Sequence, residues 1–205
     1  MDKILKSTIL IAFVIVLSMS KVYSYPVSGN IGVREFVTNY NRFADYLAQQ
    51  PNGGTVKAIS FYDVKISSFM KTNNVHVYCG MLSDGIAIYL REDTYGRLNG
   101  VLFSYSITPR NKSNAENEIY RRGEILGAAI SLSLFTMGIP LNMLEEFTKT
   151  NSGSNELFDV MEKSWRDKKH SYSMNIYNPT NRKNMIFTNA YDEKSQRFMA
   201  TIIYK

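Results

Sequence analysis

The sequence predicts an α+β protein in which antiparallel meander sheets pack against a central buried helix. Three observations lead to this fold class. Helix-like segments show apolar residues every three to four positions, two other regions alternate apolar and polar residues, and a long uncharged stretch lies between those regions. Residues 25–205 are long enough to form a single domain with a substantial core.

The first 24 residues have the order of a secretory signal peptide. A basic start with Lys3 and Lys6 precedes an apolar stretch at residues 8–19. Val22 and Ser24 then fit the small-residue positions of a cleavage site. We therefore expect cleavage after Ser24 and a secreted or periplasmic product. The alternative is an uncleaved segment that tethers the protein to a membrane.

Charge and cysteine content indicate which partners and which cellular compartment to expect. The chain has a net charge of +6, and loss of the predicted signal removes three lysines and one aspartate, which leaves +4. Because the basic residues form only short separate clusters, a nucleic acid is not an expected partner. Cys79 is the only cysteine, so no intrachain disulfide can form. For an exported protein, this favours a bacterial periplasmic or surface location.

A helix and a three-stranded meander are predicted in the first half of the chain. Apolar residues recur at helical spacing over residues 33–47, and a loop rich in proline and glycine follows. Alternating segments separated by turn residues then indicate antiparallel strands with one apolar face. The predicted strands are residues 75–79, 86–90 and 101–107, with a further strand at 56–62.

The uncharged stretch between Glu124 and Glu145 has about the length that spans a bilayer as one helix. Local signals divide it. A capping box at residues 113–116 predicts where the helix begins, and Gly138 followed by Pro140 predicts where it ends. The apolar helix that remains is too short for a bilayer core, so we expect a buried helix of a soluble fold. A membrane-tethered envelope protein that uses this stretch is the alternative.

The C-terminal part predicts another helix and a second meander. The helix covers residues 155–166. The predicted strands are residues 172–176, 185–191 and 198–204. Because helix precedes three strands in each half, the chain also fits a two-fold pseudo-repeat with halves 30–110 and 111–205, although few residue identities match.

Candidate catalytic residues are few. The sequence has two histidines, His76 and His170, and none of the common metal or nucleotide motifs. His76 and Cys79 are an odd number of positions apart in a predicted strand, so they point to opposite faces, and we expect a buried Cys79 thiol. Carboxylate pairs at 92–93 and 192–193 fall in polar turns beside arginines. We predict no catalytic residues, no metal site and no cofactor.

The predicted binding residues are His76, Tyr78, Tyr89 and Leu102. By strand alternation they lie opposite the apolar row of the first meander, where tyrosines suit an interface. We hypothesise a non-catalytic accessory protein that recognises a macromolecule, a protein rather than a nucleic acid, through this sheet face. The alternative is a hydrolase of unfamiliar type that uses carboxylates and His76. The sequence leaves the oligomeric state open.

Overall fold

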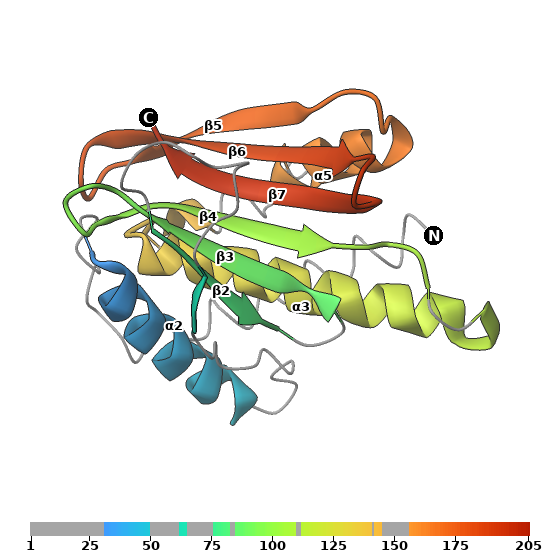
Figure 1. Cartoon of the computed structure of the whole chain (residues 1–205), viewed down its shortest axis with the longest axis horizontal. Helices are drawn as coiled ribbons and strands as arrows, with labels where there is room; N and C mark the ends of the chain where they lie inside the picture. Colours follow the sequence, from blue (N-terminus) through green and yellow to red (C-terminus); the bar gives the residue numbers. More distant parts are fainter. Residues whose placement is uncertain are drawn as a thin grey trace.

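The periodic segments of the sequence form helices and strands close to the predicted positions. The computed structural model describes residues 31–49, 62–64, 76–82, 85–109, 112–140, 142–144 and 156–205. The expected signal peptide and most of the strand expected at 56–62 lie outside these residues. The described chain confirms the α+β class, with helices packed against an antiparallel sheet (Figure 1).

The helices form where apolar residues recur at helical spacing. They are α2 (Val33–Ala48), α3 (Ala115–Thr136) and α5 (Glu156–Arg166), with a short 3-10 turn, η4 (Lys112–Asn114), before α3. The strands form where apolar and polar residues alternate. They are β1 (Tyr62–Val64), β2 (Val77–Met81), β3 (Ala87–Glu92), β4 (Leu98–Tyr105), β5 (Tyr172–Asn178), β6 (Lys183–Asp192) and β7 (Arg197–Tyr204).

The two meanders join into one antiparallel sheet with the strand order β1-β2-β3-β4-β7-β6-β5. The last strand of each meander, β4 and β7, meets its counterpart at the junction, in a continuous register from Gly100↔Ile203 to Tyr105↔Phe198. This order is what two related halves would produce, and the pseudo-repeat stays a prediction.

The Arg197 side chain strengthens this junction. Its Nε donates to Ser104 Oγ at 2.6 Å, and its Nη2 donates to the Gly85 carbonyl at 2.5 Å, beyond β4. One guanidinium therefore ties β7 to both β4 and the start of the β3 region.

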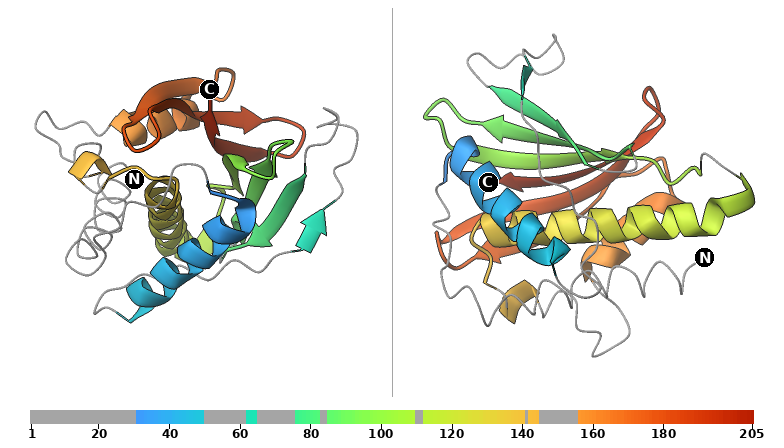
Figure 2. Two further views of the ribbon diagram at one scale, coloured as in Figure 1. Left: turned by 90° about the vertical axis from the view of Figure 1, so that its left-hand side faces the viewer. Right: turned by 90° about the horizontal axis from the view of Figure 1, so that it is seen from below.

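The helices α2, α3 and α5 lie on the same side of the sheet, which we call the inner face (Figure 2). Residues opposed across antiparallel strands project to the same side, so the register identifies the inner rows. One such row consists of Tyr78, Leu90, Val101, Ile202, Phe187 and Met174. Apolar residues of the inner face and of all three helices form one hydrophobic core.

The helix α3 is the central element of this core, as the sequence predicted. Residues 125–139, which include its C-terminal half, are all buried. In the described part of the chain, no helix is long and apolar enough to cross a membrane. The uncharged stretch is thus accounted for by the core between α2, α5 and the sheet.

The predicted capping box at the start of α3 is wrong. The N-cap residue is Asn114, and it makes no side-chain hydrogen bond to the helix backbone. Because η4 precedes the helix, Ser113 lies one position too early and Glu116 is not at the third helical position. The Asn117 amide instead donates to Asn114 Oδ1 at 2.7 Å.

The predicted end of α3 is confirmed. Gly138 has a φ of 94°, and its N–H donates to the Phe135 carbonyl at 2.9 Å. The N–H of Ile139 donates to the Leu134 carbonyl at 3.0 Å. These two bonds form a Schellman motif, in which glycine accepts the left-handed conformation without a Cβ clash.

Side chains of the second meander donate hydrogen bonds to the backbone carbonyls at the C-terminal end of α3. Asn178 Nδ2 and the Tyr204 hydroxyl both donate to the Met137 carbonyl, at 2.7 and 2.8 Å. The Thr180 hydroxyl donates to the Gly138 carbonyl at 2.6 Å. The backbone oxygens left unpaired at a helix end are thereby satisfied within the protein.

Removal of the Asn178 amide should destabilise the fold. Asn178→Ala leaves a buried carbonyl with one donor fewer, so we expect the free energy of unfolding to fall by about 1–3 kcal/mol, measured by urea denaturation. Asn184→Ala is the matched control because Asn184 is an exposed asparagine of the next strand, and its effect should stay within about 0.5 kcal/mol. Equal losses in the two variants would contradict the role given to Asn178.

Buried tyrosines should make the fold sensitive to alkali. Burial raises the pKa of Tyr40 and Tyr105 above the ordinary value of 10.0. Above that pH the unfolded chain loses these protons while the folded protein keeps them, so stability is complete below about pH 9 and falls as the pH rises. Urea denaturation at increasing pH measures the loss. Tyr40→Phe, which removes a buried hydroxyl with no hydrogen-bond partner among the described residues, should reduce it.

Candidate functional site

The candidate site lies on the outer face, which is the side of the sheet opposite α2, α3 and α5 (Figure 2). The strand register fixes which side chains stand there, because opposed residues project to the same side. The middle outer row consists of Cys79, Tyr89, Leu102, Thr201, Thr188 and Ser173.

Apolar residues group on this face in what we call the outer patch, which consists of Met81, Tyr89, Leu102, Ile186, Met199 and Ile203. The exposed fraction is 51% for Met81 and 36% for Ile203, and the other members are half-buried. Leu102 is directly opposed to Tyr89, and Ile203 to Ile186, so the patch continues across several strands.

Gly100 shapes the centre of the outer patch. A Cβ at this position would lie 3.2 Å from Ile203 Cγ1 and 3.1 Å from the Ile202 carbonyl oxygen. The Ile203 side chain therefore packs over the β4 backbone where any larger residue would push it away. The result is a low apolar surface in place of a ridge.

Charged residues border the outer patch. Arg91 is opposed to Gly100 and so stands in the same outer row as Ile203. Arg197 lies at the other end, held by Ser104, and Lys205 Nζ donates to Asn175 Oδ1 at 3.2 Å. The border is therefore mainly basic around an uncharged centre.

Asp192 is the acidic residue opposed to Arg197 in the sheet. The hydroxyl of Ser195 donates to its carboxylate at 2.6 Å, and this bond is the main cause that lowers the pKa of Asp192. The carboxylate is thus engaged within its own turn.

The structure brings together two of the four predicted binding residues. Tyr89 and Leu102 are opposed on the outer face, as expected. Tyr78 is opposed to Leu90 and belongs to the inner face, where its hydroxyl donates to Glu92 Oε2 at 3.1 Å. His76 precedes β2, is exposed, and by strand alternation shares the side of Tyr78. The prediction that all four share one face is therefore wrong.

The register of the β2–β3 hairpin explains this error. The sequence prediction placed Cys79 on the side of Ile88 and Leu90, whereas the structure opposes Cys79 to Tyr89. A shift of one residue in a hairpin inverts the faces of a strand. Val77 and Cys79 are consequently buried on the outer side, which confirms that the Cys79 thiol is buried.

The outer-face residues that were not predicted share a pattern that is present in the sequence. Ile186 and Ile203 are apolar, yet they occupy the outer positions of β6 and β7, strands whose inner positions are already mainly apolar. Met81 and Met199 are likewise apolar at outer positions. An apolar residue that breaks the alternation of a half-buried strand marks an outer face that is not fully polar.

The predicted turn carboxylates have local partners. Arg97 Nε lies 3.1 Å from Asp93 Oδ2, as expected for an ion pair in this turn. Desolvation acts to raise the pKa of Asp93, but hydrogen bonds from the backbone N–H groups of Arg97 and Tyr95 outweigh it and lower the pKa. Arg197, which lies beside the second turn, directs its guanidinium to Ser104 and Gly85.

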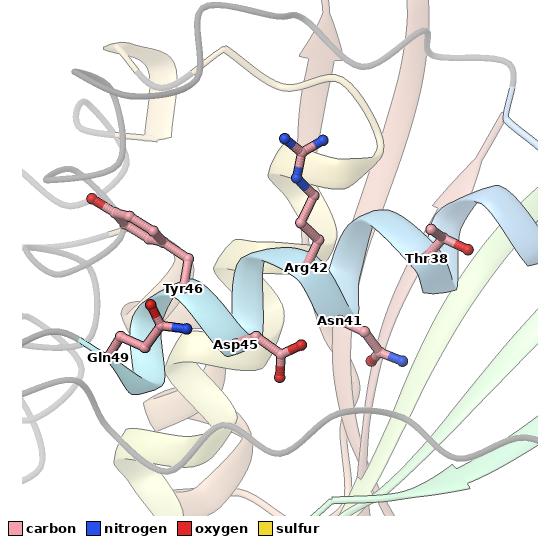
Figure 3. A pocket seen from close by; sticks show the side chains of 6 residues that line it. All are labelled: Thr38, Asn41, Arg42, Asp45, Tyr46 and Gln49. Carbon is pink, nitrogen blue, oxygen red and sulfur yellow. The ribbon is translucent and has the colours of Figure 1, made fainter.

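A second surface feature lies along α2. A hollow of about 560 Å³ is lined, in the part of the chain that the structure describes, by Thr38, Asn41, Arg42, Asp45, Tyr46 and Gln49. Figure 3 shows these side chains spreading outward from one helix. Catalytic groups need to converge on a reacting atom from defined positions, and a fan of side chains from one helix does not provide that.

Among the described residues, no group of three or more His, Cys, Asp or Glu side chains lies close enough together to hold a metal ion.

Comparison with known proteins found no matching family model, no similar curated protein and no similar solved structure. The outer face therefore has to be interpreted from its own chemistry.

Proposed function

We propose that this chain is a non-catalytic binding protein that recognises another protein through its outer face. The observation that carries the proposal is the outer patch, where apolar side chains from several strands stand on the side opposite the described helices. Contiguous exposed apolar surface is typical of interaction sites, and methionine and tyrosine are enriched in protein interfaces. We also propose export, which rests on the signal-like residues 1–24.

The chemistry of the outer face indicates what kind of partner would fit. The low surface at Gly100 and Ile203 suits a flat apolar region of the partner. Arg91, Arg197 and Lys205 at the border favour acidic groups around that region. Such border charges act mainly on orientation and on the rate of association, while the apolar centre supplies most of the affinity.

The hydrolase hypothesis gains no support from this geometry. It would need a carboxylate within hydrogen-bond reach of the His76 ring. In the described part of the chain, His76 contacts Glu92 through its backbone carbonyl, which accepts from the Glu92 N–H at 2.9 Å. The Glu92 carboxylate itself accepts from the Tyr78 hydroxyl.

Site-specific crosslinking tests the proposed face. A photoreactive amino acid in place of Ile203 should form a discrete adduct with a partner protein in the native cell envelope, because Ile203 lies within the outer patch. The same amino acid in place of Tyr95 is the matched control, since Tyr95 is 80% exposed but lies in the turn after β3. Gel mobility and mass spectrometry of the adducts give the result.

A charge placed in the outer patch should abolish that adduct. Leu102→Glu in the Ile203 crosslinking variant puts a carboxylate at the apolar centre, and we expect partner capture to fall at least about tenfold. The thermal unfolding of the variant checks that the fold is kept. Adducts that form equally at Tyr95, or that survive Leu102→Glu in a folded protein, would remove the outer face from consideration.

A further inference from the structure

The strand β5 is an edge of the sheet with the properties of a pairing strand. It lies at the end of the strand order, farthest from β1 (Figure 1), and pairs with β6 in an unbroken register over seven residues. An edge strand presents a row of unpaired N–H and C=O groups, and proteins usually protect it with charged residues, proline or a bulge. The segment Tyr172–Asn178 contains no charged residue, no proline and no register shift.

The side chains of β5 are arranged on two distinct sides. Ser173, Asn175 and Tyr177 are exposed on the outer side, and Tyr177 has an exposed fraction of 50%. Met174 and Ile176 project to the inner side, where Met174 is half-buried and Ile176 is fully buried. The strand is therefore regular and uncharged, and it is partly apolar along its inner margin.

We propose that β5 pairs with β5 of a second copy of this chain, antiparallel and about a two-fold axis at Asn175. Closed two-fold pairs are the commonest form of homo-oligomer, and they bring the same surface of both copies together. In this register Asn175 opposes Asn175 of the second copy, Ser173 opposes Tyr177, and Met174 opposes Ile176. The two sheets become one, held by backbone hydrogen bonds that neither copy can make alone.

The charge and apolar pattern of β5 favours a second copy over another extended segment. In this pairing only the residue on the axis, Asn175, faces its own copy, but a charge at or beside the axis would still come close to the same charge of the second copy, and β5 has none. The pairing also sets the half-buried Met174 opposite an apolar position of the second copy, which a polar segment would not provide. At the other edge, β1 has three residues, one of which is Asp63.

One nearby cation makes the proposal more specific. The Lys205 ammonium donates to Asn175 Oδ1 at 3.2 Å, so pairing places two lysines on the same side close to the axis. Their repulsion is screened by salt because both groups are exposed. The dimer should therefore become tighter as ionic strength rises, and Lys205→Gln should tighten it several-fold at low salt only.

Sedimentation equilibrium of protein purified after expression of the whole 205-residue sequence tests this pairing. We expect a monomer–dimer equilibrium that Asn175→Lys weakens at least about tenfold, because two ammonium groups then face each other at the axis. Asn184→Lys is the matched control, since it adds the same charge to an exposed position one strand further from the axis. Circular dichroism verifies that both variants are folded.

Hydrogen exchange identifies the surface that the dimer uses. Amides of β5 should exchange more slowly at concentrations where the dimer is populated, and this protection should disappear in Asn175→Lys. The proposal is overturned by a protein that stays monomeric at high concentration, which would leave the edge to an extended segment of another protein. It is equally overturned by a dimer whose β5 amides exchange as in the monomer. These outcomes do not depend on the proposed function, because they require no partner protein.

Discussion

The rest of the structure depends on how the buried C-terminus of α3 is satisfied. Residues 125–139 are removed from water, so the last carbonyls of the helix must find donors inside the protein. The Schellman bonds supply some of these donors, and Asn178, Thr180 and Tyr204 supply the others. Because these side chains lie on or beside β5 and β7, the same contacts fix the second meander against the helix. The central helix and the sheet are therefore specified together.

Much of this architecture could be predicted from local patterns in the sequence. The end of α3 followed from Gly138 and Pro140, because few residues other than glycine accept a positive φ. The start near Asn114 was also predicted closely, but the capping box was wrong because η4 adds a turn that places Ser113 before the capping position, and nothing in the local spacing reveals that turn. The face assignment of β2 failed for a related reason. Alternation fixes which residues of β2 share a side, but the register with β3 decides which side meets the core, and that register is not contained in the pattern of β2 alone.

The two sides of the sheet meet different demands. The inner face has to exclude water, and its rows pack against three helices. On the outer face, the two meanders meet where β4 pairs with β7. Arg197 spans this junction with its hydrogen bonds, and Gly100 leaves space for the Ile203 side chain. Arg197 thereby fixes the two meanders to each other, and Ile203 can lie close to the β4 backbone. Alternation within the first meander predicts Tyr89 and Leu102 on this side, whereas Ile186, Met199 and Ile203 join them only through the pairing of β4 with β7, a contact between residues far apart in the chain.

Trp165 gives the protein an internal optical probe. It is the only tryptophan, and its indole N–H donates to the Tyr105 hydroxyl at 2.9 Å, while that hydroxyl donates to Asn189 Oδ1 at 3.0 Å. These two hydrogen bonds link the helix α5 to β4 and β6, which belong to the first and second meander of the sheet. Its emission and the energy it receives from Tyr105 will change whenever α5 separates from the sheet, so the docking of one helix can be followed without a label.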